Sequence, residues 1–407
     1  MKAIRQINTL VVGGGQAGLA MSEHLSNNKV EHLVVERDRI AEKWRSARWD
    51  NLVANGPAWH DRFPTLKIAG VDDDGFASKT QMAKYFEDVA AAINAPIECG
   101  VEVTDAQPKD GGGYRITTSS GVIDAENIVA ATGPFQHPVF PNIIPEQDGL
   151  TQLHSYHYRN QDQLADGAVL VIGAGSSGSQ IADELLRAGR EVYLSIGPHE
   201  RPPRRYRGHD FVWWLGKLGK WEMKTPPAGK EHVTIAVSGA YDGHTIDFRK
   251  FAARGMTLLG MTQDYDDGVL NIAPDLVQNI ADGDASLLSL LAEADAYIAA
   301  NGLDLPEEKE AHIIGPDPSS LVDPIRQLNL KDANITSVIW ATGYVQDFNW
   351  LNVDTFDHAG KPMHDKGVGK VDGVYFLGLP WLSMRGSSFI WGVWEDAKYL
   401  AQHIAGR

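Results

Sequence analysis

The chain has 407 residues, enough for two or more domains with cores of their own. Its net charge of -16 disfavours nucleic acid or an anionic membrane as a partner, because both need a basic face. The single cysteine, Cys99, excludes an intrachain disulfide and a C-x-x-C redox pair. No run of 18 apolar residues is present, and the first predicted strand begins near Arg5. We therefore expect no membrane span, no secretory signal and a cytoplasmic location.

The N-terminal segment predicts a strand, a glycine-rich turn, a helix and a second strand that ends on Glu36. The turn is Gly13-Gly14-Gly15-Gln16-Ala17-Gly18, a G-x-G-x-x-G pattern. Its first glycine permits the tight turn, its second lets a pyrophosphate approach, and its third lets helix and strand pack closely. The helix N-terminus offers free amides to the phosphates, and Glu36 can bind ribose hydroxyls. The segment therefore predicts a dinucleotide site.

The middle of the chain predicts a β-meander and then a second copy of the first unit. Short alternating strands from Val101 to Val129 surround Asp110-Gly111-Gly112-Gly113. A further β-turn-α-β pattern covers 168–196, and Gly173 follows Gly13 by 160 residues. Gly175 and Gly178 repeat the spacing, which indicates an internal duplication of one supersecondary unit.

The second unit lacks an acid after its second strand, where Leu194-Ser195-Ile196 stands, and arginines follow it. A ribose 2′-phosphate would be repelled by an acid and held by guanidinium groups. The pattern therefore favours NADPH over NADH, with a solvated basic loop as the alternative. The arginines concerned are Arg201, Arg204, Arg205 and Arg207.

The stretch 198–243 is rich in Pro, Arg, Trp and Gly and predicts long loops rather than regular structure. Helices are expected near 248–254, 286–301 and 391–404, and buried strands at 337–340 and 374–377. The predicted fold class is α/β, with two Rossmann-like dinucleotide-binding domains, the second inserted in the first. We expect residues 1–160 to form the first part of an FAD domain, 161–330 the NADPH domain with substrate-side loops, and 331–407 the second part of the FAD domain.

Over nearly its whole length the chain resembles the class B flavin-dependent monooxygenases, which include the flavin-containing and the plant indole-pyruvate monooxygenases. Lys43-Trp44-Arg45 is similar to the segment that carries the family's tryptophan near the flavin. Ala131-Thr132-Gly133 and Ala341-Thr342-Gly343-Tyr344 match its two alanine-threonine-glycine signatures, where the chain crosses between domains. The stretch 378–388 resembles the last loop that contacts the flavin.

The resemblance implies three candidate catalytic residues. Asn55, in the turn Asn55-Gly56-Pro57, would contact NADP and the oxygenated flavin, unless this segment is only a turn. His154 matches the end of the family pattern F-x-G-x-x-x-H, but the phenylalanine is missing and the glycine is one position out of register. Its role is therefore left between structural and catalytic, and Tyr158-Arg159, in place of a Trp-Pro ending, disfavours Baeyer–Villiger chemistry. Arg385 would bind an acidic substrate or pair with a surface acid.

The expected cofactors are FAD and NADPH, and no metal ligands are expected. The residues expected to bind the cofactors are Gly13, Gly15, Gln16, Ala17, Gly18, Glu36, Arg37, Lys43, Trp44, Arg45, Asn55, Gly56, Val103, Ala131, Thr132, Gly133, Gly173, Gly175, Ser176, Ser177, Gly178, Ser179, Gln180, Ser195, Arg201, Arg204, Arg205, Ala341, Thr342, Gly343, Leu379 and Pro380.

The leading functional hypothesis is a monooxygenase in which NADPH reduces FAD, oxygen adds to give a flavin hydroperoxide, and one oxygen atom enters a small organic substrate. The alternatives are an NADPH-dependent flavin dehydrogenase or oxidase that passes electrons to another acceptor, and a nucleotide sensor without turnover. A dithiol disulfide reductase is excluded because Cys99 has no partner cysteine. We expect O2 and a small molecule as partners, and a monomer or homodimer. Six aromatic residues suggest either an aromatic-lined space or packing: Trp213, Trp214, Trp221, Trp381, Phe389 and Trp391.

Overall fold

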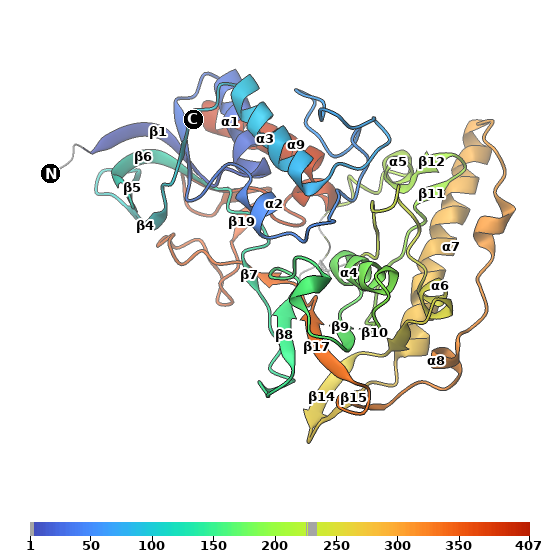
Figure 1. Ribbon diagram of the computed structural model, residues 1–407. Helices are drawn as coiled ribbons and strands as arrows, with labels where there is room; N and C mark the ends of the chain where they lie inside the picture. Colours follow the sequence, from blue (N-terminus) through green and yellow to red (C-terminus); the bar gives the residue numbers. More distant parts are fainter. Residues whose placement is uncertain (1–3, 225, 227–233) are drawn as a thin grey trace.

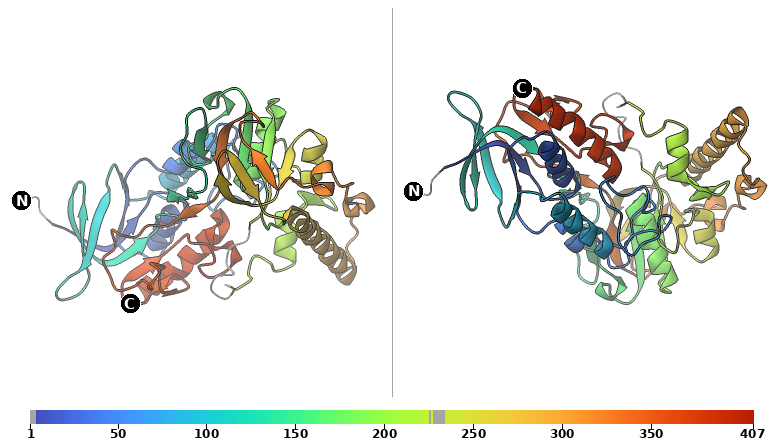
Figure 2. Two further views of the ribbon diagram at one scale, coloured as in Figure 1. Left: turned by 90° about the horizontal axis from the view of Figure 1, so that it is seen from below. Right: turned by 90° about the horizontal axis from the view of Figure 1, so that it is seen from above.

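The computed structural model describes residues 4–224, 226 and 234–407. The chain forms two α/β lobes that lie side by side (Figure 1). The first and last parts of the chain share one lobe, and the long helix α7 (Leu276–Asn301) lies at the far end of the other (Figure 2). No helix of the described residues is long and apolar enough to cross a membrane. The expected nesting of one α/β fold within another is confirmed.

The first lobe is built on a mainly parallel sheet with strand order β19-β20-β21-β6-β1-β2-β3, extended by β4 and β5. The central strand β1 pairs in parallel with β2 and with β6, and β21, from the end of the chain, pairs in parallel with β6. These strands carry continuous apolar runs, as expected for a parallel sheet that is covered on both faces. The bounds are β1 (Arg5–Val12), β2 (His32–Glu36), β3 (Ile97–Cys99), β4 (Val103–Pro108), β5 (Tyr114–Thr118), β6 (Gly121–Ala130), β19 (His364–Asp365), β20 (Val368–Gly369) and β21 (Val374–Phe376).

Helices α1 (Gln16–Asn27), α3 (Lys79–Ala92) and α9 (Ile390–Ala405) pack in this lobe, with α9 against α1. Sequence analysis missed α3, although its start carries a recognisable signal. The Ser78 hydroxyl accepts from the Gln81 amide at 3.2 Å, and the Gln81 side chain accepts from the Ser78 amide at 3.0 Å. This capping box satisfies two backbone donors at the helix start.

The second lobe is built on a five-stranded sheet with order β13-β10-β9-β17-β8. Each neighbouring pair in it is parallel. Its outer strands correct the expected domain limits, because β8 lies before residue 161 and β17 lies after residue 330. The inserted fold therefore takes in 151–340. The bounds are β8 (Thr151–His154), β9 (Ala168–Ile172), α4 (Ser176–Arg187), β10 (Val192–Ser195), α6 (Phe248–Ala253), β13 (Thr257–Leu259) and β17 (Ile335–Trp340), with a ladder of β14 (Thr262–Asp266), β15 (Val269–Ile272) and β16 (Gln327–Asn329) beside them.

The two passages between the lobes run next to each other. On leaving the first lobe the chain forms β7 (His137–Pro138), and on returning it forms β18 (Tyr344–Val345). The two strands pair antiparallel, and the Val139 amide also donates to the Gly343 carbonyl at 3.1 Å. Backbone hydrogen bonds thus hold together the two segments that connect the inserted lobe to the first lobe.

The stretch expected to form loops contains regular structure. It holds the two-stranded ladder of β11 (Arg205–Tyr206) and β12 (His209–Asp210), followed by α5 (Phe211–Lys217), which the Asp210 side chain caps. Residues 225 and 227–233 of that stretch lie outside the described residues. Helix α7 also begins ten residues earlier than expected, at Leu276. Its first half carries Asn279, Gly283 and Asp284, which have low helix propensity. These residues lie against Ile196, His199 and Arg201 of the same lobe.

Candidate functional site

The first glycine turn has the geometry that a dinucleotide needs. A Cβ atom on Gly18 would lie 1.8 Å from the Gly13 carbonyl oxygen, so only glycine lets α1 pack this closely on β1. Gly13 has a φ of +116°, and a Cβ there would lie 2.5 Å from the Ala131 carbonyl oxygen. At Gly15 an added Cβ would meet no described atom within 4 Å. The space above Gly15, at the N-terminus of α1, is where a pyrophosphate fits.

Glu36 ends β2 beside this turn. Its carboxylate accepts from the Gly14 amide at 2.6 Å and from the Asp38 amide at 2.9 Å. A carboxylate oxygen has a second lone pair, so both oxygens retain acceptor capacity for ribose hydroxyls. Gly14 leaves room for this contact, because a Cβ there would lie 2.8 Å from the Glu36 Cβ. Arg37, the next residue, forms an exposed ion pair with Asp38 at 3.3 Å.

The C-terminal loop closes over the same turn. The Gln16 side chain donates to the Ser388 carbonyl at 3.1 Å, and a Cβ on Gly378 would lie 2.9 Å from that of Ala17. Leu379 in this loop is buried and Pro380 is exposed. Buried Asp396 of α9 accepts from the Ser383 hydroxyl and anchors the loop, and burial raises the pKa of its carboxyl.

The short helix α2 (Glu42–Ser46) carries Lys43, Trp44 and Arg45 at the lobe junction. The Lys43 ammonium donates to the Tyr156 hydroxyl at 2.6 Å, Trp44 packs on the first core, and Arg45 pairs with Glu87. Sequence analysis missed Arg48, whose guanidinium lies 5.9 Å from the Trp44 ring and 5.2 Å from the Phe135 ring. Val103, also expected to bind a cofactor, lies in β4 of the meander.

The two alanine-threonine-glycine segments occupy matching places at the two turns. Ala131 and Ala341 follow β6 and β17, and their carbonyl oxygens face Gly13 and Gly173 respectively. The Thr132 hydroxyl accepts from Gln136 at 2.9 Å, and the Thr342 hydroxyl donates to the Val139 carbonyl at 2.6 Å. Gly133 and Gly343 have φ values of +76° and +85°, which favour glycine. Both segments therefore turn the chain out of one lobe and hold it against a glycine motif.

The second glycine turn repeats the first, but a chain segment lies over it. A Cβ on Gly178 would lie 1.7 Å from the Gly173 carbonyl oxygen. The Ser176 hydroxyl donates to the Ile235 carbonyl at 2.7 Å, and a Cβ on Gly175 would meet the Thr234 side chain at 3.1 Å. Ser177 is half-buried at the start of α4, and the Ser179 hydroxyl donates back to the Gly175 carbonyl at 2.8 Å.

Ile196 stands in the second fold where Glu36 stands in the first, 160 residues earlier. It is fully buried, and its amide donates to the Leu259 carbonyl at 2.9 Å. The Ser195 hydroxyl also points inward and donates to the Gly260 carbonyl at 2.9 Å. The end of β10 therefore offers a second nucleotide no carboxylate, and Ser195 shapes the adjoining turn.

Three of the four arginines expected to hold a 2′-phosphate already pair with carboxylates, among them Arg207 with Asp295 at 2.7 Å. Arg201 is 5% exposed and donates to Asp284 of α7, with its Nε at 2.9 Å from the carboxylate. Arg204 is 2% exposed and pairs with Asp210. Buried ion pairs of this kind are costly to open, which disfavours both residues as ligands of a 2′-phosphate. Arg205 is exposed and donates to the Asp242 carbonyl at 3.0 Å.

Asn55 lies where the two lobes meet. Its side-chain oxygen accepts from Gln180 of α4 at 2.8 Å, and its carbonyl accepts from Arg204 at 2.7 Å. The following amide, of Gly56, donates to Asp61 at 2.9 Å. Because Oδ1 faces Gln180, the amide nitrogen of Asn55 is directed to donate elsewhere.

His154 forms a structural link rather than a reactive group. The ring is fully buried at the end of β8. Its Nδ1 accepts from the Tyr156 amide at 3.0 Å, which leaves the proton on Nε2, 3.1 Å from the Gly343 carbonyl. Burial lowers the pKa of His154 from 6.5 to about 4. Both ring nitrogens bind the backbone, which favours the structural alternative over the catalytic one.

Arg385 bridges the lobes. Its guanidinium lies 3.1 Å from the Glu200 carboxylate of the second lobe, and its amide donates to the Met223 carbonyl at 3.0 Å. Glu200 is therefore an acid that pairs with Arg385, the second of the two alternatives that the sequence left open. An acidic substrate would have to compete with Glu200 for this arginine.

Residues 10–215, half of the chain, match the family model described as pyridine nucleotide-disulphide oxidoreductase. The chain belongs to this family. The protein named uncharacterized oxidoreductase CzcO-like, of Geobacillus kaustophilus (strain HTA426), is 34% identical over 98% of both chains. Indole-3-pyruvate monooxygenase YUCCA1 of Oryza sativa subsp. japonica is 31% identical over 46% of this chain and 47% of its own. A mutant flavin monooxygenase from Stenotrophomonas maltophilia has the same fold, with a TM-score of 0.68, 17% identity and 99% coverage of both chains.

This member of the pyridine nucleotide-disulphide oxidoreductase family is an enzyme, an oxidoreductase, and its cofactors are FAD and a pyridine nucleotide. The resemblance to the class B flavin-dependent monooxygenases is confirmed. Cys99 is exposed at the end of β3. Within the described residues no group of three or more His, Cys, Asp or Glu side chains could hold a metal ion.

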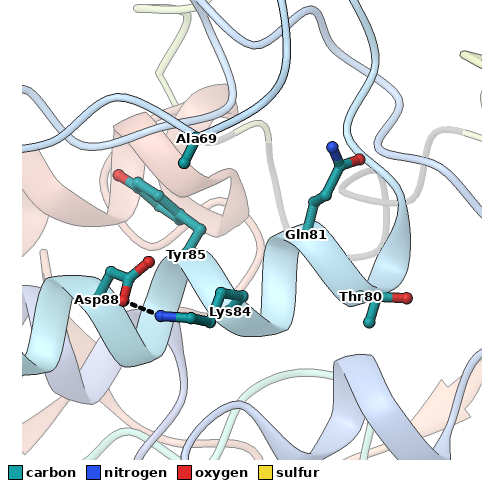
Figure 3. Close-up of a pocket in the computed structure, with 6 residues that line it drawn as sticks. All are labelled: Ala69, Thr80, Gln81, Lys84, Tyr85 and Asp88. Carbon is teal, nitrogen blue, oxygen red and sulfur yellow. Dashed lines mark hydrogen bonds and ion pairs between the residues drawn. The ribbon is translucent and has the colours of Figure 1, made fainter.

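A depression between α3 and the loop that carries Ala69 lies apart from these groups (Figure 3). It contains the ion pair of Lys84 and Asp88, and it draws no residue from either glycine turn or from the C-terminal loop. We therefore place the functional site at the lobe junction. The residues that line the depression are Ala69, Thr80, Gln81, Lys84, Tyr85 and Asp88.

Three alanine substitutions test the two turns. Gly15→Ala meets no described neighbour and has an ordinary φ of -89°, so it should fold. Its methyl group enters the space for the pyrophosphate, and overpacking of about 1–3 kcal/mol should weaken FAD binding roughly 5- to 150-fold.

Gly18→Ala should lower stability and FAD content together. Gly178→Ala creates a similar clash, so it should destabilise the inserted fold and abolish reduction by NADPH, while the chains that remain folded should keep FAD. FAD per chain, melting temperature and anaerobic reduction report these effects, and a Gly15→Ala protein with parental FAD affinity would contradict the placement.

The acid sensitivity of the fold should depend on His154. The folded chain holds this pKa near 4, and the unfolded chain near 6.5, so the unfolded chain takes up the proton first. The stabilisation is complete above pH 6.5 and is lost as the pH falls to about 4, by up to about 3 kcal/mol. His154→Gln cannot titrate, so its melting temperature should fall less steeply over this range. Parallel curves for the parent and the variant would refute the expectation.

Proposed function

We propose that this oxidoreductase is an NADPH-dependent flavin monooxygenase that inserts one oxygen atom from O2 into a small organic substrate. The observation that carries the proposal is the position of Asn55. A side-chain amide, held by Gln180 at 2.8 Å, lies at the junction of two dinucleotide folds with its donor group directed away from that contact. A monooxygenase needs such a donor where reduced flavin, nicotinamide and oxygen meet.

The side chains of this chain would orient and enclose the cofactors rather than react covalently. The turn at Gly15 would hold the pyrophosphate of FAD, and Glu36 would hold its ribose. The turn at Gly175 would hold the pyrophosphate of NADPH. The C-terminal loop, tied to Gln16 through Ser388, would keep water from the flavin. When bound and reduced, FAD would supply the oxygen-transfer chemistry, and Asn55 would donate a hydrogen bond to the oxygen atom being transferred.

The preference for NADPH now rests mainly on Ile196. An acid at that position would repel a 2′-phosphate, and the buried isoleucine does not. Arg205 is the arginine in 201–207 that, among the described residues, binds a backbone carbonyl rather than a carboxylate. Its exposed guanidinium is therefore the one we assign to the phosphate.

The second candidate is an NADPH-dependent flavin dehydrogenase or oxidase that passes electrons to another acceptor. Cys99 is the only cysteine of the sequence, so the acceptor would not be an internal dithiol despite the name of the family. Arg204, Gly56 and His60 around the Asn55 turn are buried, which favours the monooxygenase, because an oxidase need not shield an intermediate from water.

Oxygen uptake decides between the two candidates. Purified enzyme should consume NADPH and O2 together, and label from 18O2 should enter a product when a panel of small substrates is supplied. Electron transfer to a dye or quinone, with all oxygen returned as hydrogen peroxide for every substrate of the panel, would instead establish the dehydrogenase or oxidase.

Asn55→Ala should uncouple the enzyme. Loss of a buried hydrogen bond costs about 1–3 kcal/mol, so unproductive release of hydrogen peroxide should accelerate roughly 5- to 150-fold while NADPH still reduces FAD. Product and peroxide per NADPH are the measurements. Gln180→Ala is the matched control, because it removes the contact between lobes and keeps the Asn55 amide. Equal uncoupling in both variants would show that Asn55 acts only as a bridge.

The arginines should separate into two classes. Arg205→Ala should raise the KM for NADPH about tenfold, as expected for one lost charge-assisted bond, and leave NADH unaffected. Arg201→Ala leaves Asp284 paired with Arg249 alone, so it should lower the unfolding free energy by about 1–3 kcal/mol without changing the ratio of NADPH to NADH efficiency. The reverse assignment of the two effects would overturn this interpretation.

A further inference from the structure

Five rings from three separate segments meet at the lobe junction, and we call them the aromatic box: Trp59, His60, Trp221, Phe389 and Trp391. The His60 ring stacks on Trp221 with centroids 5.4 Å apart and lies 5.7 Å from the Trp391 ring. Trp221 lies 5.7 Å from Trp391 and 5.1 Å from Phe389, and Trp59 lies 5.5 Å from His60. Phe389 is partly open to solvent, with 36% of its surface exposed. His60 and Trp221 are buried, and the box reaches the surface at Phe389.

Two polar atoms of the box lack a partner among the described residues. They are Nε2 of His60 and Nε1 of Trp391, and both are buried. His60 as a whole is only 8% exposed. Buried polar groups in native structures almost always have a hydrogen-bond partner. Two such atoms on rings 5.7 Å apart point to a ligand that supplies what the protein does not.

The neighbouring acid fixes what each atom offers. Nδ1 of His60 lies 2.7 Å from the Asp61 carboxylate, whose other oxygen accepts from the Gly56 amide at 2.9 Å. A carboxylate only accepts, so the tautomer that fits this contact carries its proton on Nδ1 and presents a lone pair at Nε2. The indole nitrogen of Trp391 can only donate. The box thus presents one acceptor and one donor within an apolar surround.

The box adjoins the elements assigned to the flavin. Phe389 follows Ser388, whose carbonyl binds Gln16 of the first glycine turn at 3.1 Å. On the other side, Asp61 holds the Gly56 amide next to Asn55. A small molecule in the box would therefore lie between the C-terminal loop and the Asn55 turn.

We infer that the aromatic box binds a planar aromatic substrate with a hydroxyl group, an inference that rests on the proposed function and names its substrate class. The hydroxyl donates to Nε2 of His60 and accepts from Nε1 of Trp391, while the ring of the substrate packs on the aromatic side chains. A hydroxyl matches this pair because it is donor and acceptor at once.

Charge argues for a neutral substrate over an acidic one. Two cations border the box, and both already have acceptors. Arg62 donates to the Trp59 carbonyl at 3.4 Å, and the guanidinium of Arg385 is paired with Glu200 at 3.1 Å. The Asp61 carboxylate, which lies 2.7 Å from Nδ1 of His60, would repel the carboxylate of a substrate. The aromatic hydroxyl compound is therefore preferred to an aromatic acid of the same size.

The test is a binding titration on oxidised, FAD-loaded enzyme with phenol, toluene and benzoate, followed by tryptophan fluorescence and flavin absorbance. Phenol should bind at least about tenfold more tightly than toluene, which has the ring without the hydroxyl, and more tightly than benzoate. Equal affinity for phenol and toluene, or preference for benzoate, would overturn the inference.

Two variants identify the atoms involved. His60→Asn keeps a donor toward Asp61 and removes the acceptor at Nε2, and Trp391→Phe keeps an aromatic ring and removes the donor. Each should reduce the preference for phenol over toluene about tenfold, in protein shown to be folded and FAD-loaded. Trp213→Phe, the same change in α5 outside the box, should leave the preference intact. Unchanged preference in both box variants would refute the assignment.

Because binding is read on oxidised enzyme, its outcome is separate from that of the proposed function. Phenol bound through His60 and Trp391 in an enzyme that fails to incorporate oxygen would retain the site and reject the monooxygenase. Oxygen incorporation into other substrates, with no discrimination between phenol and toluene, would retain the monooxygenase and reject the site.

Discussion

The buried guanidinium of Arg204 links the two nucleotide folds. Arg204 pairs with Asp210 at the start of α5 and donates to the Asn55 carbonyl of the first lobe at 2.7 Å. Its charge lies 4.8 Å from the Phe76 ring and 4.6 Å from the Phe211 ring. Burial lowers the pKa of Arg204, and the Asp210 carboxylate opposes that effect. Removing either partner of the pair would leave an unpaired buried charge, at a cost of about 3–5 kcal/mol, so the pair fixes the guanidinium that binds the Asn55 carbonyl.

The Asn55 turn is consequently fixed from both sides. Arg204 binds its carbonyl and Gln180 binds its side chain, while a Cβ on Gly239 would lie 2.1 Å from the Ala54 carbonyl oxygen. The lobes are also joined at their base by the paired strands β7 and β18. A rotation of one lobe on the other would have to break contacts at both places. A donor held this firmly requires little reorganisation when charge develops beside it, which is the property that a site for oxygen transfer needs.

The parts of this structure that local sequence determines could be predicted, and the parts that distant pairing determines could not. Both glycine turns follow from residues within one βαβ unit, because the steric limits at Gly18 and Gly178 are local. Helix α3 was also predictable, since Ser78 and Gln81 form a capping box three residues apart. The commitment of Arg201 was not, because its acid, Asp284, lies 83 residues away on a helix whose early start was itself missed.

The two glycine turns share a backbone and differ in what covers them. At the first, the position above Gly15 is open in the described structure. At the second, the Ser176 hydroxyl already binds the Ile235 carbonyl, and Thr234 lies against Gly175. A nucleotide at the second turn must compete with these contacts, and each contact it displaces reduces its net affinity. The same supersecondary unit can therefore retain one cofactor through many reaction cycles and release the other once in each cycle, which is the asymmetry that a flavin and its nicotinamide reductant require.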